Sequence, residues 1–174
     1  SYEGIIDPYG IQTIAHGLGS AVEAVFIKRT DGSADWMTGA AAADWTDYAA
    51  LNYNAAYAPS ATAFRDIDPT ASFITLGGSA GLNGSGKDYV CYAFHSVEGY
   101  SKINSYVGNG VDNKGPFVYT GFKPAFVLIK GIDASRDWWI SDNKRDPFND
   151  NDIRILWPND NAAETNYTNY DKDY

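Results

Sequence analysis

The residues best suited to chemistry in this chain form two oxygen-rich motifs of the same spacing. Asp31 and Asp35 delimit the first, Asp133 and Asp137 delimit the second, and each has a Ser at its centre. Alternate side chains in a turn can converge on one cation, and such oxygens are the ligands that Ca²⁺ prefers. Neither motif has the full twelve-residue calcium loop with its terminal Glu. A β-hairpin turn capped by Asp is the simpler interpretation. Ca²⁺ at Asp31, Asp35, Asp133 and Asp137 is the alternative, and no other cofactor is expected.

Two glycine-rich segments resemble catalytic motifs but lack essential parts. Residues 81–88 nearly match a phosphate-binding loop, but Asp88 stands where a Mg²⁺-binding hydroxyl is needed. Residues 77–81 match the Gly-x-Ser-x-Gly pattern of a nucleophilic serine, although no helix is expected after them. A carboxylate pair for glycoside cleavage cannot be located from the sequence, because Asp residues are so numerous and the four Glu are scattered. We therefore predict that the protein is not an enzyme, and a glycan-degrading enzyme is an alternative.

Aromatic residues are the feature most relevant to binding. Trp45, Tyr53 and Tyr57 lie in an Ala-rich stretch without clear periodicity. Core packing or a subunit interface explains them most simply, but exposed aromatic rings also stack on sugars. If a glycan is bound, these three residues are the predicted contacts. Trp138 and Trp139 are consecutive, so in a strand they face opposite ways, and one of them is expected in the core.

Composition and charge exclude several classes of function. The chain has 174 residues and a net charge of −9, which disfavours nucleic acid as a partner. No apolar window approaches the length of a membrane-spanning helix, so membrane insertion is not expected. The single Cys91 excludes an internal disulfide and is expected in a buried strand. Sequons at Asn83 and Asn166 are glycosylation candidates in a secreted context only.

Short β-branched and aromatic runs alternate with clusters of Gly, Asn, Asp and Ser, which is typical of strands and turns. Strands are expected at Ile11–Ala15, Ala24–Thr30, Trp36–Thr38, Tyr48–Tyr53, Ser72–Leu76, Asp88–His95, Ser101–Val107, Phe117–Thr120, Ala125–Lys130, Trp138–Ser141 and Ile153–Trp157. Helical turns are expected at Ala40–Ala43 and Asn161–Glu164. This pattern predicts an all-β fold, an antiparallel β-sandwich of the jelly-roll (concanavalin-like) type.

The chain contains an internal repeat. Five of the nine residues from Lys28 to Trp36 are identical to those from Lys130 to Trp138, and further downstream residues 54–56 resemble residues 161–163. We therefore predict one β-sandwich domain over residues 1–174, built by internal duplication. Repeat 1 covers about residues 11–110, and repeat 2, which is truncated, covers about residues 115–174.

The second repeat lacks the strands that end the first. The first copy continues into residues 73–77 and 89–95, whereas the sequence stops at Tyr174 before any counterpart. Bare sheet edges are prone to aggregation. The missing strands are therefore expected in a longer polypeptide or in a neighbouring subunit that donates them.

Three stretches resemble a known family. They are residues 14–36, which begin Ile-Ala-His-Gly-Leu; residues 97–110, which end Tyr-Val-Gly-Asn-Gly; and residues 115–130, Gly-Pro-Phe-Val-Tyr-Thr-Gly-Phe-Lys-Pro-Ala-Phe-Val-Leu-Ile-Lys. Together they resemble an uncharacterised β-rich domain family of tail-fibre and other virion proteins of tailed bacteriophages. The family has no established catalytic residues. The resemblance implies a structural, trimeric or polymeric virion appendage that contacts a glycan on the host surface.

We therefore expect a structural and adhesive subunit of an extracellular assembly, a phage tail or fibre. Its expected partners are copies of itself, other virion or filament subunits, and a cell-surface glycan. Arrayed subunits would turn weak single contacts into avidity. The principal alternative is a subunit of a non-viral extracellular filament joined by strand donation.

Overall fold

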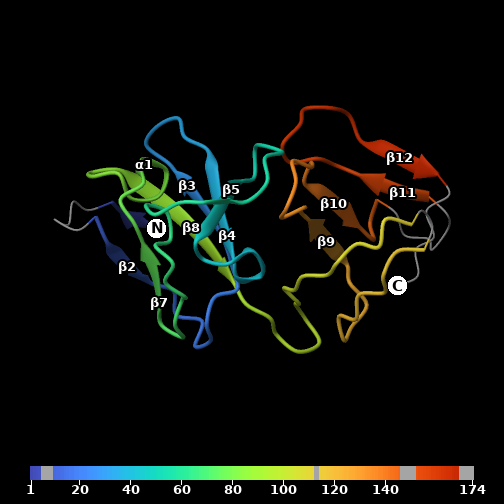
Figure 1. The fold of residues 1–174 in the computed structure, drawn as a ribbon, viewed down its shortest axis with the longest axis horizontal. Helices are drawn as coiled ribbons and strands as arrows, with labels where there is room; N and C mark the ends of the chain where they lie inside the picture. Colours follow the sequence, from blue (N-terminus) through green and yellow to red (C-terminus); the bar gives the residue numbers. More distant parts are fainter. Residues whose placement is uncertain (5–9, 112–113, 146–151, 169–174) are drawn as a thin grey trace.

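The computed structural model describes residues 1–4, 10–111, 114–145 and 152–168, and every strand pair in them is antiparallel. The predicted all-β class is confirmed. The helices of the described residues are one 3₁₀ turn, Ala41–Ala43, and one α-helical turn, α1 (Ala80–Asn83). Figure 1 shows two lobes, with β1 to β8 in the N-terminal lobe and β9 to β12 in the C-terminal lobe.

A six-stranded sheet forms the centre of the N-terminal lobe. Its order is β1 (Tyr2–Glu3), β8 (Asp88–Phe94), β3 (Ala24–Arg29), β4 (Trp36–Ala40), β5 (Asp47–Ala50) and β6 (Ala58–Pro59). Side chains alternate between the two faces of a strand. In β3, Val25 and Ile27 are fully buried on one face, whereas Phe26 and Lys28 are half-buried on the other.

A second layer covers the buried face of this sheet. It contains the pair β2 (Gln12–Ala15) and β7 (Phe73–Leu76), together with α1. Ile74 and Leu76 from β7, and Leu82 from α1, join the β3 side chains in one apolar core. Each fully buried side chain of this size contributes roughly 1.5–3 kcal/mol.

The C-terminal lobe consists of two hairpins. One pairs β9 (Phe126–Ile129) with β10 (Trp139–Asp142), and the other pairs β11 (Asp152–Ile155) with β12 (Thr165–Thr168). A bridge between Ile140 and Leu156 links the hairpins. The four strands therefore follow one another in a meander, as β3 to β6 do in the other lobe (Figure 1).

The two meanders share one strand register. Adding 102 to both members of the Ile27–Met37 pair gives the Ile129–Trp139 pair. Further along, adding 107 to both members of the Asp47–Pro59 pair gives Arg154–Asn166. The bridge between the hairpins obeys the same offsets, since it is the counterpart of the pair Thr38–Ala49.

Several expected elements differ from the observed ones. The helical turn expected at Ala40–Ala43 is confirmed as the 3₁₀ turn, but Asn161–Glu164 forms no helical turn. Ser101–Val107 and Phe117–Thr120 form no strands, although Ser101 makes one bridge to Val97. A β-rich sequence forms a strand only where a neighbour pairs with it. The short strands β1 and β6, and β12, were not predicted.

Candidate functional site

The first oxygen-rich motif is held by an asparagine from the loop after β5. Asn52 accepts a hydrogen bond from the backbone N–H of Trp36 at 2.9 Å, and its amide donates to Oδ1 of Asp35 at 2.9 Å. Lys28 donates to the carbonyl oxygen of Ala34. Its ammonium lies 5.9 Å from the centre of the Trp36 ring. These contacts therefore stabilise the β3–β4 turn.

The second motif makes the same contacts. Asn159 accepts from the backbone N–H of Trp138 at 2.7 Å and donates to Oδ1 of Asp137 at 2.8 Å. Lys130 donates to the carbonyl oxygen of Arg136 at 2.8 Å and lies 5.9 Å from the Trp138 ring centre. The repeated residues thus have repeated structural partners, which favours the hairpin-turn interpretation of both motifs.

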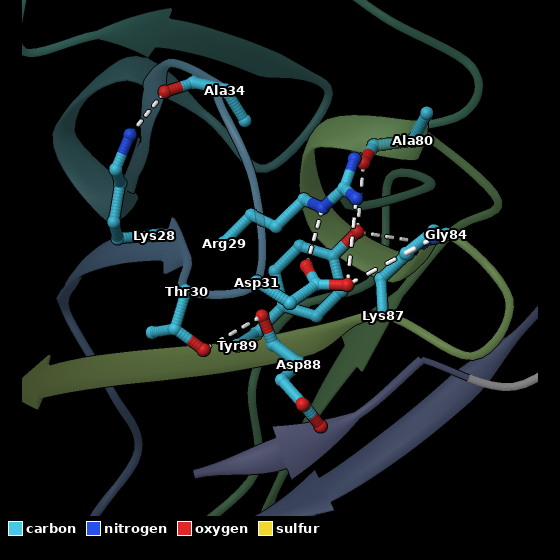
Figure 2. Close-up of polar contacts among 10 residues, drawn as sticks. All are labelled: Lys28, Arg29, Thr30, Asp31, Ala34, Ala80, Gly84, Lys87, Asp88 and Tyr89. Atoms are coloured by element: carbon cyan, nitrogen blue, oxygen red, sulfur yellow. Dashed lines mark hydrogen bonds and ion pairs between the residues drawn. The ribbon is translucent and has the colours of Figure 1, made fainter.

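Asp31 lies in an ion-pair cluster rather than an open site. Its carboxylate is 2.5 Å from Nε of Arg29 and 3.9 Å from Nζ of Lys87. Figure 2 shows these three residues together. The hydrogen bond from Arg29 lowers the pKa of Asp31. In the second motif, Asp133 is exposed. Within the described part of the chain, no three His, Cys, Asp or Glu side chains lie where they could hold a metal ion together.

The Gly-x-Ser-x-Gly segment has a structural role. The prediction that no helix follows it was wrong, because α1 begins directly after Ser79. Ser79 nevertheless has an ordinary extended backbone, with φ −63° and ψ 128°, whereas a nucleophilic serine of this type sits on a strained turn. Tyr89 stabilises the helical turn α1 through two hydrogen bonds, which Figure 2 draws. Its hydroxyl donates to Ala80 O at 2.7 Å and accepts from Gly84 N–H at 2.8 Å.

The three predicted ligand-contact aromatics do not lie together on an exposed surface. Trp45 is only 3% exposed and packs edge-on against Phe64 in the core, which agrees with the core-packing interpretation and excludes Trp45 as a predicted glycan contact. Tyr57 is half-buried, and its hydroxyl is 3.2 Å from Oγ1 of Thr38. Tyr53 alone is well exposed. An Ala-rich stretch offers no periodicity that would have separated buried from exposed rings.

The two lobes meet at the Trp138 motif. Trp138 is buried, its indole N–H donates to Ala50 O at 3.1 Å, and its ring lies 6.2 Å from that of Phe26. Close by, Tyr57 N–H donates to Ile132 O at 3.1 Å. Trp139 faces the opposite way and stacks on Tyr167. The expectation that one tryptophan of this pair is in the core is confirmed.

An exposed aromatic face was missed by the sequence reasoning. Phe26 of β3, Trp36 of β4, and Tyr92 and Phe94 of β8 lie on the side of the central sheet away from the core; we call them the outer aromatic face. Tyr92 is 48% exposed, and Phe94 is similarly exposed. The signal was present in β8, where Tyr92 and Phe94 alternate with the smaller Cys91 and Ala93.

The rings of the outer aromatic face contact one another across strands. Phe26 is paired directly with Tyr92 in the sheet. Trp36 stacks on Tyr92 at a centroid distance of 6.3 Å, and Phe26 meets Phe94 edge-on at 5.8 Å. Cross-strand pairs and their common sheet hold the rings in fixed positions. A rigid row of half-exposed rings can accept the apolar faces of sugar rings or a protein surface.

An acidic depression of about 920 Å³ lies at the lobe junction. Its lining includes Glu23, Asp44, Asp66 and Asp68. Asp44 and Asp66 have left-handed backbones, with φ 71° and 55°. Glu23 already accepts a hydrogen bond from Ser96 N–H at 2.5 Å. The indole of Trp45 contributes little accessible surface there, so this depression offers no ring for stacking.

The two sequons differ in accessibility. Asn83 lies in α1 and is only 3% exposed. Glycosylation requires an accessible side chain, so the prediction of glycosylation at Asn83 is wrong. Asn166 is exposed on β12, and its glycosylation remains a prediction.

The comparisons with known proteins place the chain in a family. The domain of unknown function DUF7483 matches residues 7–174. The chain belongs to this family. Neither a curated protein nor a solved structure matches the chain. Helices of the described residues are all too short to span a membrane.

Proposed function

We propose that the protein is a structural and adhesive module of an extracellular assembly, a phage tail or fibre, which binds a host-surface glycan through its outer aromatic face. The observation that supports this proposal is the row of half-exposed rings on β3, β4 and β8. The net charge of −9 disfavours an anionic polymer. The expected ligand is therefore a neutral polysaccharide.

Single sites of this kind bind weakly. An aromatic contact contributes about 0.5–1.5 kcal/mol beyond its buried area, which suits a module whose affinity comes from many copies held together. The resemblance to tail-fibre and virion proteins supports the same setting. The proposal assigns no pair of catalytic carboxylates. If the protein degrades glycan instead, new reducing ends will appear when it is incubated with host polysaccharide.

Binding to neutral polysaccharides by the wild type and by ring-deleted variants tests the proposal. We expect Tyr92→Ala and Phe94→Ala each to weaken binding by about tenfold, because each removes a stacking surface. Phe73→Ala is the matched control. The exposed fraction of Phe73, 49%, is similar to that of Tyr92, but Phe73 lies on β7 in the other layer. Affinity electrophoresis or calorimetry measures the change.

The opposite pattern would contradict the proposal. If Phe73→Ala weakened binding as much as Tyr92→Ala, the outer aromatic face would not be the contact surface. Tyr53→Ala belongs to the same series, because Tyr53 is the exposed member of the sequence-predicted contacts. If only Tyr53→Ala weakened glycan binding, the contact surface would be the loop after β5 and not the outer aromatic face.

We also infer that β9 to β12 are a second copy of β3 to β6, and that the complete unit is a jelly-roll sandwich. The common register and the matched Lys, Asp, Asn and Trp contacts support a duplication. In the N-terminal lobe, β2 and β7 provide a second layer over the sheet. The inferred sandwich would have the same layer in both copies.

A further inference from the structure

The outer edge of β9 is free in the part of the chain that the structure describes. Its counterpart, β3, has a neighbour on each side, β4 and β8, whereas β9 pairs only with β10. Asn143 N–H donates to Ala125 O at 3.0 Å. Because hydrogen-bonded positions alternate along an antiparallel strand, the backbone groups of Phe126 and Leu128 point to the free edge.

Side chains beside this edge are also uncovered. Ile27 is fully buried, but its counterpart Ile129 is 37% exposed. Phe126 is 58% exposed, and Phe117 and Tyr119 are exposed more strongly still. In the N-terminal lobe, Ile27 is covered by side chains of β7, α1 and β8. None of the described residues supplies a counterpart of these three elements in the C-terminal lobe.

We propose that a segment with the pattern of β7, α1 and β8 docks on the C-terminal lobe. Its last strand would run antiparallel to β9 and bond the backbone of Phe126 and Leu128. Its first strand would pair with residues 116–119, which correspond to β2 when Gly17-Leu18 is aligned with Gly121-Phe122. Apolar side chains at the positions of Ile74 and Leu76 would cover Ile129. This inference rests on the proposed repeat but not on glycan binding.

The order of elements in the N-terminal lobe identifies the source of the segment. There, the covering elements follow β6 along the chain, after the connection formed by residues 60–72. The strand that corresponds to β6 is β12. By this order, the segment that we propose for the C-terminal lobe belongs to the same polypeptide and follows β12. An extended β-strand on a free edge gains backbone hydrogen bonds and apolar burial together.

An extended chain tests this inference. Residues 60–95 are copied and appended after Tyr174, and hydrogen exchange is measured at the amides of Phe126 and Leu128. We expect both amides to exchange about tenfold more slowly than in the unextended chain, because each gains a backbone hydrogen bond. A control extension carries Ile74→Asp and Tyr89→Asp in the appended copy only, and it should give no protection.

Two results would overturn the proposal. In one, the appended segment is digested by protease as a free tail and exchange in β9 is unchanged. In the other, the unextended chain already protects Phe126 and Leu128 and does so more strongly at higher protein concentration, which would assign the edge to a second copy. The N-terminal lobe and its outer aromatic face are the same in both chains. Glycan binding is therefore measured separately, and its failure would leave this result untouched.

Discussion

At the scale of residues, one asparagine stabilises each of the two similar turns. Asn52 satisfies the Trp36 N–H and the Asp35 carboxylate at once, and Asn159 does the same for Trp138 and Asp137. The sequence showed the repeated Asp and Trp, because they stand at a fixed spacing. It did not show the asparagines as their partners, because these come from a different loop at a different offset.

Asn52→Ala tests the importance of this arrangement. The variant leaves a half-buried N–H and a carboxylate without their partner, so the free energy of unfolding should fall by about 1–3 kcal/mol. Asn104→Ala is the control, since Asn104 is exposed and, among the described residues, bonds only the adjacent Ser105 N–H. Urea unfolding measures both. Equal stability of the two variants would show that the Asp35–Asn52 contact is incidental.

Asp142 at the end of β10 gives the C-terminal lobe a pH dependence. Backbone N–H groups of Arg145 and Lys144 donate to Oδ1, both at 2.9 Å, and the Arg145 side chain donates to Oδ2 at 2.7 Å. These bonds, with those from Arg145 the largest, lower the pKa of Asp142 to about 2. A lowered pKa in the folded state means that the ionised form stabilises the fold.

The stabilisation by Asp142 should therefore be complete above the unfolded pKa of about 4 and lost as the pH falls towards 2. Titration of its carboxyl carbon by NMR should give a midpoint near 2. Asp142→Asn should be less stable than wild type at pH 7 and should approach it at pH 2. A wild-type midpoint near 4 would show that the Arg145 contacts are not maintained in solution.

At the scale of elements, local composition predicted most strands of both lobes, whether they are paired on one side or on both. β3 and β8 were recovered within one residue at each end, because their buried positions alternate with half-exposed ones. Ser101–Val107 and Phe117–Thr120 have the same local composition but no neighbouring strand. Strand formation there depends on a partner that local composition cannot reveal.

The docking of the β9–β10 turn on β5 is the contact between elements that joins the lobes. Trp138→Ala should lower the free energy of unfolding by about 3–5 kcal/mol, as expected for a large buried ring. Trp138→Phe should lower it less, by about 1–3 kcal/mol, because one aromatic ring is kept while the hydrogen bond to Ala50 O and part of the buried ring volume are lost.

Trp36→Ala is the matched control for this experiment, since Trp36 is the counterpart of Trp138 in the repeat and is only half-buried. Its effect should be clearly smaller than that of Trp138→Ala. A larger effect of Trp36→Ala would mean that the outer aromatic face, and not the lobe junction, dominates stability. Chemical denaturation followed by tryptophan fluorescence distinguishes these outcomes.

At the scale of the whole molecule, the sequence could predict the all-β class and the internal similarity. It could not separate Trp45, which is buried, from Trp36, which is half-exposed on the outer face. Both tryptophans lie near strands in the sequence. Their exposed fractions differ because Phe64 packs beneath β4 and covers Trp45. The binding surface that we propose therefore depends on the order of strands in the sheet. In that order β8 pairs with β3, although more than half the length of the first repeat separates them in the sequence.

The central claim is that the outer aromatic face is the contact surface of an extracellular assembly. A cryo-electron microscopy map of the native assembly at side-chain resolution tests it most directly. We predict density of a glycan ligand against Tyr92 and Phe94, with many copies of the module displaying this face outward. A map in which these rings face bare solvent, while glycan occupies the acidic depression at the lobe junction, would contradict the claim.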